Sequence, residues 1–486
     1  MSDDAIVGLE ADLSDITGIA SHSCHVKPGY LYMAIRGEEF NGEDFIDEAI
    51  AKGATIIALA DDAKISKKDG IKYIFTKNTR KYLAKAAASH YKPQPQNIVG
   101  ITGTSGKTST AEFYRQICNV AGRQAASIGT LGVNGGSIDF LGAQILAMTT
   151  PDTITMHGTL QVWAMCEIKN IALEVSSHGL VQHRVDGINF SAAAFTNFTQ
   201  DHLDYHITFA SYFAAKMRLF SELLPAGAYA ILNRDIPEFN KIKDICINRG
   251  HKLITYGMQE ADITFRYDGR ILHIRAFGKD YATEFRLPGQ FQQYNAACAL
   301  GLVAASDIDV YDAVQALSLI RAVDGRLQQV ANYNDATIFV DYAHKPDALE
   351  KVLLSAREFT KGRLHVIFGC GGDRDHSKRP IMGEIALKLA DVTIVTDDNP
   401  RTEDADKIRR DIIGTHHAQI IEIPDRREAI TYGIAQLQSG DVLIVAGKGH
   451  EEYQIIGEKK HYFSDKEEVK KAVSLLRDQM MDTLFP

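Results

Sequence analysis

The chain has 486 residues, of which 45% are hydrophobic and 24% charged. This composition is typical of a globular protein, and the length predicts about three domains. The formal net charge of -9 at pH 7 argues against a general nucleic-acid binder, which would carry a basic excess.

The six cysteines are scattered and show no CxxC spacing. This pattern favours reduced thiols, most of them in the core, over a disulfide framework. The opening run MSDDAIVGLEADL lacks the apolar stretch of a signal peptide. No apolar run approaches the roughly 20 residues of a membrane-spanning helix. We therefore expect a cytoplasmic monomer that neither inserts into a membrane nor binds nucleic acid.

The first part of the chain alternates short apolar strands with helical stretches. Residues 26–35 predict a turn and then a strand, and residues 45–53 predict a helix that ends at Gly53, before the strand TIIALA. Residues 91–97, YKPQPQN, hold two prolines without apolar periodicity and indicate a linker. We place a first domain at residues 1–92.

A strand, a glycine-rich turn and a helix follow in the run NIVGITGTSGKTSTAEF. The glycines let backbone N–H groups close around phosphates, and the helix N-terminus favours the same anion. Lys107 would reach the terminal phosphates and Thr108 would hold Mg²⁺. Ile101 stands where the strict phosphate-loop pattern has glycine, so residues 103–109 are a variant of it. The alternative is an ordinary glycine turn.

Candidate metal ligands follow two later strands. Glu174, at the end of IALEV, is the natural second Mg²⁺ ligand. His202 follows AAAFTNF, although histidine is a less usual ligand for a hard cation. Lys216 lies on a predicted helix, and each of these residues could instead be a polar cap. Strands and helices alternate to residue 320, which predicts a central domain at residues 93–320 with a parallel sheet covered by helices.

A further alternation predicts a third domain at residues 321–486. LHVIFGCGG, DVTIVTDD and DVLIVAG each predict a buried strand that ends in a polar or glycine-rich turn, and ligands gather at such carboxyl ends. We expect Trp163 in the core. The charged clusters at residues 67–69 and 465–468 are interpreted as solvated faces.

Nine runs of sequence resemble the Mur ligase family. GTSGKTS, TTPDT, EVSSHGLVQHRVDG, TNFTQDHLDYH and AAKMRLF are similar to its central domain; DYAHKPDAL, FGCGGDRDHSKRP, DDNPRTED and AGKGHEEYQ are similar to its diamino-acid-adding members. The resemblance covers nearly the whole chain, in order. It implies an α/β protein of three domains: a small N-terminal UDP-binding domain, a central P-loop parallel-sheet ATPase domain and a C-terminal Rossmann-like domain.

The resemblance implies ATP and two Mg²⁺ ions on the central domain. Lys216 matches the family's carbamylated (N-carboxylated) lysine, whose negative charge can lie beside Mg²⁺. The implied catalytic residues are Lys107, Lys216, Arg326 and His344. The implied ATP-binding residues are Gly103, Thr104, Ser105, Gly106, Lys107, Thr108, Ser109, Asn295, Arg326 and Asp341. The implied metal ligands are Thr108, Glu174, His202 and Lys216.

The resemblance also implies two small-molecule substrates, UDP-N-acetylmuramoyl-L-alanyl-D-glutamate and meso-diaminopimelate. They would be joined through an acyl phosphate and a tetrahedral intermediate, in peptidoglycan precursor synthesis. The residues expected at the UDP-muramoyl-peptide are Ser23, Thr149, Thr150, Ser176 and Arg184. Those expected at diaminopimelate are Arg374, Asp398, Asn399, Arg401, Gly447 and Glu451. Arg401 offers a planar fork for the distal carboxylate of diaminopimelate, whereas it would repel the distal amine of lysine.

Three segments depart from the family's pattern. His376 and Ser377 stand where a lysine and a small residue are usual. His22 and Cys24 flank Ser23 where aspartate and arginine are common. Lys345 replaces a common threonine, and it would add positive charge near the phosphates or face solvent. The alternatives are ligation of L-lysine or another diamino acid, a related ligase such as folylpolyglutamate synthase or the D-Ala-D-Ala-adding enzyme, a P-loop ATPase coupled to motion or assembly, and a non-catalytic relative.

Overall fold

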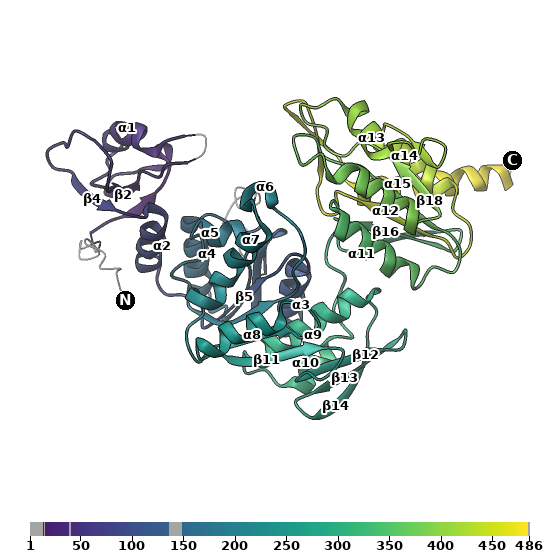
Figure 1. The fold of residues 1–486 in the computed structure, drawn as a ribbon, viewed down its shortest axis with the longest axis horizontal. Coiled ribbons are helices and arrows are strands. Elements are labelled where there is room, and N and C mark those ends of the chain that lie inside the picture. Colours follow the sequence, from purple (N-terminus) through teal and green to yellow (C-terminus); the bar gives the residue numbers. More distant parts are fainter. Residues whose placement is uncertain (1–12, 14, 38–39, 136–147, 485–486) are drawn as a thin grey trace.

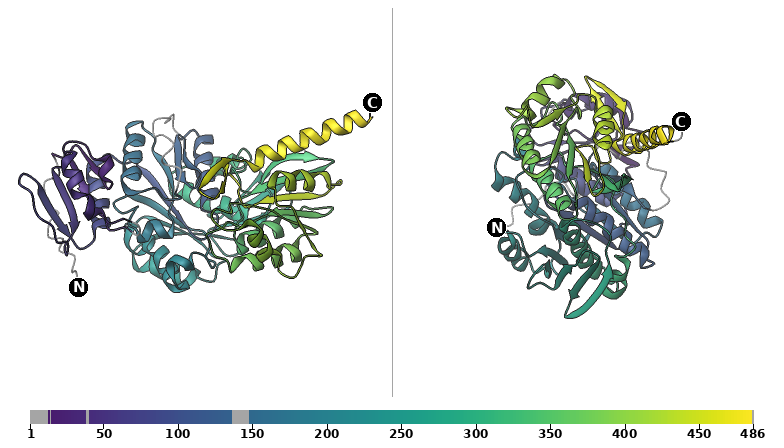
Figure 2. Two further views of the ribbon diagram at one scale, coloured as in Figure 1. Left: turned by 90° about the horizontal axis from the view of Figure 1, so that it is seen from above. Right: turned by 90° about the vertical axis from the view of Figure 1, so that its right-hand side faces the viewer.

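The computed structural model describes residues 13, 15–37, 40–135 and 148–484. The opening residues behind the expectation of no signal peptide lie almost entirely outside this part. The three larger sheets follow one another along the chain and lie in a row, and the last helix projects at the end away from the first sheet (Figures 1 and 2). Among the described helices, none has the length and apolar character to cross a membrane.

The N-terminal domain is a four-stranded parallel sheet in the order β1-β2-β3-β4. Alternate residues of β2 face opposite cores: Leu31 and Met33 pack with α2, and Tyr32 packs with α1. The predicted strands and helix near residues 26–60 are confirmed. Residues 91–96 lie in no helix or strand, and their role as a linker remains a prediction. The elements are β1 (Gly18–Ala20), the 3-10 helix η1 (Ser23–His25), β2 (Tyr30–Met33), α1 (Ile46–Ala51), β3 (Ile56–Ala60), β4 (Lys72–Thr76) and α2 (Thr79–His90).

The central domain has a ten-stranded sheet in the order β14-β13-β12-β11-β10-β9-β5-β8-β6-β7. Its strands are β5 (Asn97–Thr102), β6 (Ala125–Gly129), β7 (Gly132–Asn134), β8 (Asn170–Glu174), β9 (Phe190–Phe195), β10 (Tyr229–Asn233), β11 (Lys252–Gly257), β12 (Ile263–Tyr267), β13 (Ile271–Ala276) and β14 (Lys279–Glu284). Its helices include α3 (Lys107–Val120), α4 (Thr153–Met165), α5 (Ser177–Val181), α6 (Leu203–His206), α7 (Phe209–Arg218), α8 (Phe239–Asn248), α9 (Gln290–Ala304) and α10 (Val310–Ala316).

The predicted parallel sheet is confirmed for the middle of the central domain, but its edges differ. Strand β7 is antiparallel to β6, and β13 is antiparallel to both β12 and β14. Short turns join these edge strands, and antiparallel strands can be joined that way, whereas a parallel pair needs a long crossover. Helices α3 and α9 cover one face of the sheet, and α4, α7 and α8 cover the other, where Trp163 is fully buried as expected.

The C-terminal domain has a six-stranded sheet in the order β15-β16-β20-β17-β18-β19, parallel except for β15. Its strands are β15 (Gln328–Tyr333), β16 (Ala336–Asp341), β17 (Leu364–Phe368), β18 (Val392–Val395), β19 (Ile420–Glu422) and β20 (Val442–Ala446), with the hairpin β21 (Tyr453–Ile456) and β22 (Lys459–Tyr462). Its helices are α11 (Pro346–Arg357), α12 (Lys378–Leu389), α13 (Ala405–Ile413), α14 (Arg426–Ala435) and α15 (Asp465–Leu484).

The cluster at residues 465–468 corrects a prediction. Asp465 is fully buried, and its carboxylate accepts hydrogen bonds from Arg426 at 2.7 and 2.8 Å. Glu468 is 5% exposed and pairs with Arg427. This cluster is therefore not a solvated face, because α14 brings two arginines against the start of α15.

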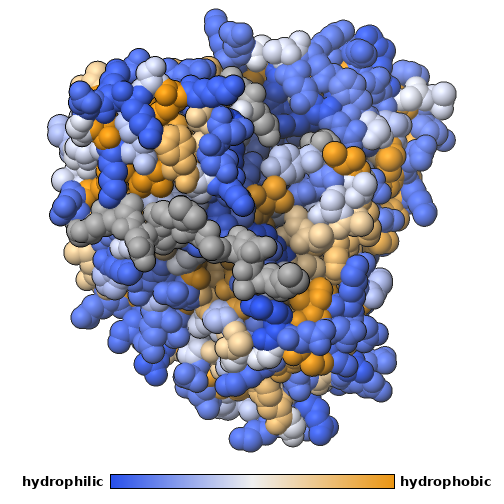
Figure 3. Space-filling model, turned by 60° about the vertical axis from the view of Figure 1, so that its left-hand side comes forward, coloured by the Kyte–Doolittle hydropathy of each residue, from blue (hydrophilic) through white to orange (hydrophobic). Residues whose placement is uncertain are grey.

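The face of the molecule in Figure 3 is mainly hydrophilic, with apolar side chains in scattered groups.

Four of the six cysteines, Cys118, Cys246, Cys298 and Cys370, are buried, and all six are free thiols. This confirms the expectation that most of them lie in the core. The predicted limits at residues 92 and 320 remain predictions.

Candidate active site

The glycine-rich turn lies between β5 and α3, where the sequence places it. Gly103 and Gly106 have φ of +143° and +84°, a region that glycine adopts without steric strain. A Cβ on Gly106 would lie 2.5 Å from Asn295 Oδ1, so the turn packs closely against α9. Thr108 and Ser109 are buried in the first turn of α3. The turn therefore lies at a helix N-terminus, a place in proteins that favours phosphate binding.

A neighbouring loop braces this turn from the end of β9. The backbone N–H of Thr104 donates to the carbonyl of Asn197 at 2.9 Å. The backbone N–H of Ser105 donates to the side-chain oxygen of Asn197, also at 2.9 Å. Thr104 Oγ1 donates to the carbonyl of Thr199 at 3.2 Å. The loop after β9, residues 197–202, and the glycine-rich turn are thus held together by hydrogen bonds.

Two lysines point into the turn. Lys107 Nζ donates to the carbonyls of Gly103 and Thr104 at 2.9 and 2.8 Å. Lys216 Nζ donates to the carbonyl of Gly103 at 2.7 Å and lies 4.6 Å from the centre of the Tyr212 ring. Burial lowers the pKa of Lys107 to about 8, and burial together with the charge of Lys107 lowers the pKa of Lys216 well below its usual value. Both effects favour the neutral amine of Lys216 over its ammonium form.

Glu174, at the carboxyl end of β8, joins the turn to the next loop. Its carboxylate accepts from Thr108 Oγ1 at 3.0 Å and from the backbone N and Oγ1 of Thr130 at 2.8 and 3.1 Å. Burial raises the pKa of Glu174, and the charge of Lys107 opposes that shift. A hydroxyl and a carboxylate side by side are hard oxygen donors, so Thr108 and Glu174 fit a magnesium ion.

Four predicted substrate residues form one network beside Glu174. Thr150 Oγ1 donates to the last carbonyl of β8 at 2.8 Å and accepts from Ser176 N at 3.0 Å. Arg184 Nη1 donates to the carbonyl of Thr150 at 2.7 Å, and Thr149 Oγ1 lies 3.1 Å from the Thr130 hydroxyl. Sequence reasoning missed Thr130, because nothing in the sequence of its loop indicates that it donates hydrogen bonds to Glu174.

Ser23 is separate from this network. It lies in the N-terminal domain on η1, and its hydroxyl donates to Glu48 at 2.8 Å. The fifth residue predicted at the UDP-muramoyl-peptide therefore belongs to a different domain from the other four.

His202 lies in the loop after β9 with φ of +52°. Its Nε2 is 3.3 Å from Asp201 Oδ2, and its ring centre is 4.8 Å from that of His178. Burial and the charge of Lys345 lower its pKa to about 3, so its imidazole is neutral and able to accept a bond. Its role as a metal ligand remains a prediction. Asp201 was missed, because an aspartate beside a histidine has no distinctive pattern.

Residues of the C-terminal domain reach the same place. Arg326 Nη2 donates to Thr108 Oγ1 at 3.2 Å, and its guanidinium lies 4.6 Å from the centre of the Tyr342 ring. Asp341 accepts two backbone hydrogen bonds, at 2.5 and 2.7 Å. His344 Nδ1 donates to the carbonyl of Tyr342 at 2.7 Å, and burial, aided by Lys345 and Lys378, lowers its pKa to about 3.

The residues predicted at diaminopimelate meet at the carboxyl ends of β17, β18 and β20. Asn399 Nδ2 donates to Glu451 Oε2 at 3.1 Å. A Cβ on Gly447 would lie 2.8 Å from Asp398 Oδ2. Burial, together with the charge of Asp398, raises the pKa of Glu451. These four residues form one pocket wall.

Arg401 and Arg374 flank a glycine at the other side of this pocket. Arg401 has φ of +51°, and its Nη1 donates to the carbonyl of Gly372 at 2.6 Å. A Cβ on Gly371 would lie 2.9 Å from Arg401 Nη1 and 3.9 Å from Arg374 Cγ. The absence of a side chain at Gly371 thus leaves room beside the guanidinium group of Arg401.

Lys448 is a functional candidate that sequence reasoning missed. Its side chain is fully buried, and its Nζ donates to Asn399 Oδ1 and to the carbonyl of Tyr453 at 3.0 and 2.9 Å. Nζ also lies 3.2 Å from Asp398 Oδ1. Burial alone would raise the pKa of Asp398, but Lys448 and Arg426 hold it below its usual value. The run GKGHE contains Lys448, but the run does not show that this lysine is buried, because the burial depends on packing against residues 398–401.

A cleft of about 1010 Å³ separates the central and C-terminal domains. The central domain contributes Thr130 and Thr149 to its lining, and the C-terminal domain contributes Tyr342, His450 and Glu451. Pockets at domain boundaries are a common place for ligands. The cleft therefore connects the network beside Glu174 with the pocket of Asn399.

Comparisons with protein families cover most of the chain. Residues 15–91 match the model described as Mur ligase family, catalytic domain. Residues 101–303 match the Mur ligase middle domain, and residues 325–449 match the Mur ligase, glutamate ligase domain.

Similar proteins carry one recurring name, UDP-N-acetylmuramoyl-L-alanyl-D-glutamate–2,6-diaminopimelate ligase. The protein of that name from Agrobacterium fabrum is 42% identical, over 95% of this chain and 94% of that one. The one from Chelativorans sp. is 44% identical, over 96% of each chain. A solved structure of a ligase with the same name is 29% identical, with a TM-score of 0.68 over 95% of both chains. The MurF ligase of Thermotoga maritima, solved with ADP, shares the fold at 19% identity and a TM-score of 0.64.

Proposed function

The chain belongs to the Mur ligase family, and from this we propose that it is an ATP-dependent ligase that joins diaminopimelate to UDP-N-acetylmuramoyl-L-alanyl-D-glutamate. The observation that carries the proposal is the position of Glu174. Its carboxylate contacts Thr108, at the phosphate-binding helix, and Thr130, beside the network of Thr149 and Thr150. ATP phosphates and the acceptor carboxylate would therefore meet at one residue.

The reaction needs positive charge at that meeting point. A carboxylate is a poor acyl donor, and phosphorylation by ATP gives an acyl phosphate with a good leaving group. The amine of the diamino acid then attacks the acyl carbon, and phosphate leaves from the tetrahedral intermediate. Lys107 and Arg326 lie where they would stabilise the transferring phosphoryl group, an electrostatic contribution that is usually the largest in such chemistry.

Magnesium would be held by Thr108 and Glu174, with His202 and Lys216 as further predicted ligands. When bound, it would neutralise charge on the phosphates and on the acyl phosphate. Carbamylation of Lys216 requires an unprotonated amine, and the burial that lowers the pKa of this lysine favours that form. The carbamate would be an anion, so it would attract a cation that the ammonium group would repel.

The pocket of Arg401, Asn399 and Glu451 favours a diamino acid that also carries a distal carboxylate. Arg401 would pair that carboxylate bidentately. Glu451, which is half-buried and paired with Asn399, would accept the distal ammonium. L-lysine lacks the carboxylate and would leave the guanidinium unpaired.

We place the reaction in the cytoplasm, where ATP is available. One chain carries every proposed site residue, which supports a functional monomer. The small-molecule substrates account for the cleft without a nucleic-acid or membrane partner. The reaction would serve peptidoglycan precursor synthesis.

The test is phosphate release by the purified protein with ATP, Mg²⁺ and the UDP-muramoyl-dipeptide, comparing meso-diaminopimelate with L-lysine and confirming product mass. Turnover with diaminopimelate and none with lysine is expected. Turnover with lysine would keep the ligase but remove the role given to Arg401. No product with either amine would contradict the proposed function.

A further inference from the structure

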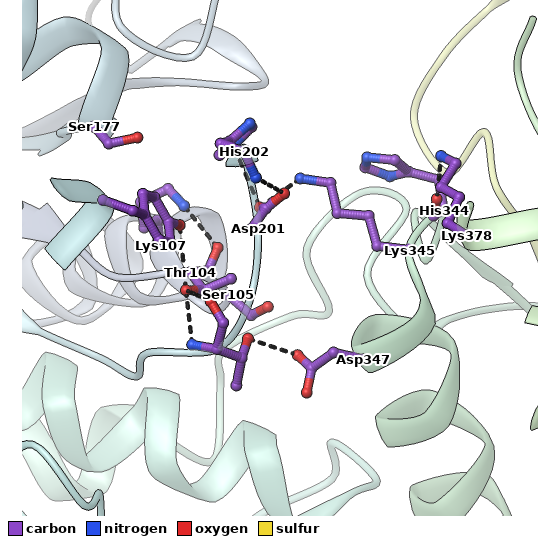
Figure 4. A network of polar contacts seen from close by, with 12 residues as sticks. Thr104, Ser105, Lys107, Ser177, Asp201, His202, His344, Lys345, Asp347 and Lys378 are labelled. Atoms are coloured by element: carbon purple, nitrogen blue, oxygen red, sulfur yellow. Dashed lines mark hydrogen bonds and ion pairs between the residues drawn. The ribbon is translucent and has the colours of Figure 1, made fainter. Parts of the chain in front are cut away.

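Lys345 links the C-terminal and central domains. It is the residue before α11, and its Nζ lies 2.6 Å from Asp201 Oδ2 (Figure 4). The Lys345 side chain is 31% exposed and that of Asp201 is 10% exposed. A second contact lies beside the first, where Thr199 Oγ1 donates to Asp347 Oδ2 at 3.1 Å. Of the two environments predicted for Lys345, the structure therefore favours the one near the phosphate site.

The loop that receives Lys345 is the loop that braces the glycine-rich turn. Thr199, which contacts Asp347, also exchanges two hydrogen bonds with Thr104, at 3.2 and 3.1 Å. Figure 4 shows Lys345 reaching toward Asp201 and His202, with Lys107 on the other side of that loop. The ammonium group of Lys345 thus comes from one domain to the phosphate-binding turn of another.

Cations gather at this place from both domains. Besides Lys107 and Lys216, the C-terminal domain contributes Lys378, whose Nζ donates to the carbonyl of His344 at 2.9 Å. After burial, the charge of Lys345 is one cause of the lowered pKa of Lys107, Lys216 and Lys378. Like charges destabilise one another at close range. A bound polyphosphate would offset that repulsion.

We propose that Lys345 is a phosphate-binding residue supplied by the C-terminal domain, and that it contacts the terminal phosphate of ATP. Its ion-pair partner in the structure is Asp201, which it would exchange for the phosphate. A lysine suits this exchange because its compact charge sits on a flexible stem and binds phosphate as a point charge. The inference rests on the proposed function only in requiring ATP as the ligand.

The test is direct binding of ATP and of ADP, each with Mg²⁺, to the full chain by calorimetry. Lys345→Gln should weaken ATP binding by about tenfold or more, the effect of losing a charge-assisted hydrogen bond, and should leave ADP binding within about threefold of the wild type. Lys345→Arg should keep most of the ATP affinity. Lys388→Gln, an exposed lysine on α12, is the matched control and should bind both nucleotides like the wild type.

Equal weakening of ATP and ADP by Lys345→Gln, or no weakening, would overturn the assignment to the terminal phosphate. Asp201→Asn separates a phosphate contact from a purely structural link. A phosphate contact predicts that Asp201→Asn retains ATP binding, because Lys345 remains. If Asp201→Asn and Lys345→Gln lose the same affinity, and the double variant loses no more, the ion pair is only structural and the proposal is wrong.

These measurements need neither diaminopimelate nor the muramoyl-dipeptide. A chain that binds ATP through Lys345 but forms no product would contradict the proposed function and keep this inference. A ligase that turns over normally with Lys345→Gln at limiting ATP would keep the function and reject the inference.

Discussion

Three buried or half-buried lysines differ in what surrounds them. Lys216 is 1% exposed beside another ammonium group, which favours its neutral form. Lys448 is equally buried, but it lies against the carboxylate of Asp398. Lys345 is partly exposed and pairs across a domain boundary. The same residue type is therefore suited to a carbamate, to a structural ion pair and to a phosphate contact, because its burial and its partners differ between the three places.

Arg401→Ala tests the specificity of the pocket. We expect kcat/KM for diaminopimelate to fall by the equivalent of about 2–5 kcal/mol, the usual effect of truncating one partner of a buried charge pair. Steady-state kinetics with varied diaminopimelate would measure the change. Arg410→Ala, an exposed arginine on α13 whose guanidinium is 3.7 Å from Asp404, is the control and should behave like the wild type. An unchanged kcat/KM for Arg401→Ala would reject the pocket assignment.

Lys448→Met tests whether this lysine positions the pocket. Removing it leaves the carboxylate of Asp398 buried without its main cation, which typically costs about 3–5 kcal/mol of stability. Denaturant unfolding would show the loss, and adding Asp398→Asn should restore part of it. Lys471→Met, on the exposed side of α15, should unfold like the wild type. If Lys448→Met is as stable as the wild type, the ion pair with Asp398 does not hold the pocket.

The shape of the turn between β5 and α3 depends on the unusual backbone conformation of its glycines. Two of its residues have positive φ, and one lies against Asn295 of α9. Strand β5 ends beside β8 and β9 in the sheet. The turn, Glu174 and the loop after β9 are consequently neighbours. Local backbone conformation and sheet order together position the proposed phosphate site.

Gly106→Ala separates the conformation of the turn from its contact with Asn295. An alanine at φ of +84° costs about 1–3 kcal/mol, and its Cβ would displace Asn295. We expect both lower stability and an ATP affinity reduced by at least about tenfold, measured by thermal unfolding and calorimetry. Gly122→Ala is the control, because Gly122 has φ of +73° and a Cβ there would have no atom within 4 Å. It should lose similar stability but bind ATP normally, and a matching loss of affinity in both variants would contradict this explanation.

The whole molecule places its chemistry between domains. The central domain supplies the turn, Glu174 and the network of Thr150, and the C-terminal domain supplies Arg326 and the pocket of Asn399. Contacts at Thr108–Arg326 and at Asp201–Lys345 are among those that join the two domains. Closing such a cleft would exclude water that could otherwise hydrolyse an acyl phosphate.

Acid should destabilise the central domain through His157. This histidine is fully buried on α4, and burial lowers its pKa from 6.5 to about 4. The imidazole of His157 binds a proton more readily in the unfolded chain than in the folded one. Its contribution to the free energy of unfolding is therefore fully present above pH 6.5, and it is lost as the pH falls toward 4, by up to about 3 kcal/mol. Unfolding followed between pH 7 and 4 should show a shallower decline in His157→Gln. An unchanged decline would mean that the imidazole is not neutral in the folded protein.

Much of the fold followed from local patterns in the sequence. The strand, glycine turn and helix at residues 97–120 and the burial of Trp163 were predictable, because hydrophobic period and turn residues act over short distances. The candidate residues were predictable as types at the ends of strands. The resemblance supplied their roles, which a single sequence without that resemblance would have left open.

The tertiary structure alone decided which charged groups are buried and which of them meet. Asp465 was predicted to be solvated, and it is buried because Arg426 arrives from α14. Lys448 gave no sign of burial, and the partner of Lys345 lies 144 residues away in the chain. A charge is stable in the interior only when a partner comes from elsewhere in the fold. The sequence by itself therefore determined the elements and the family, and long-range packing determined the electrostatics of the site.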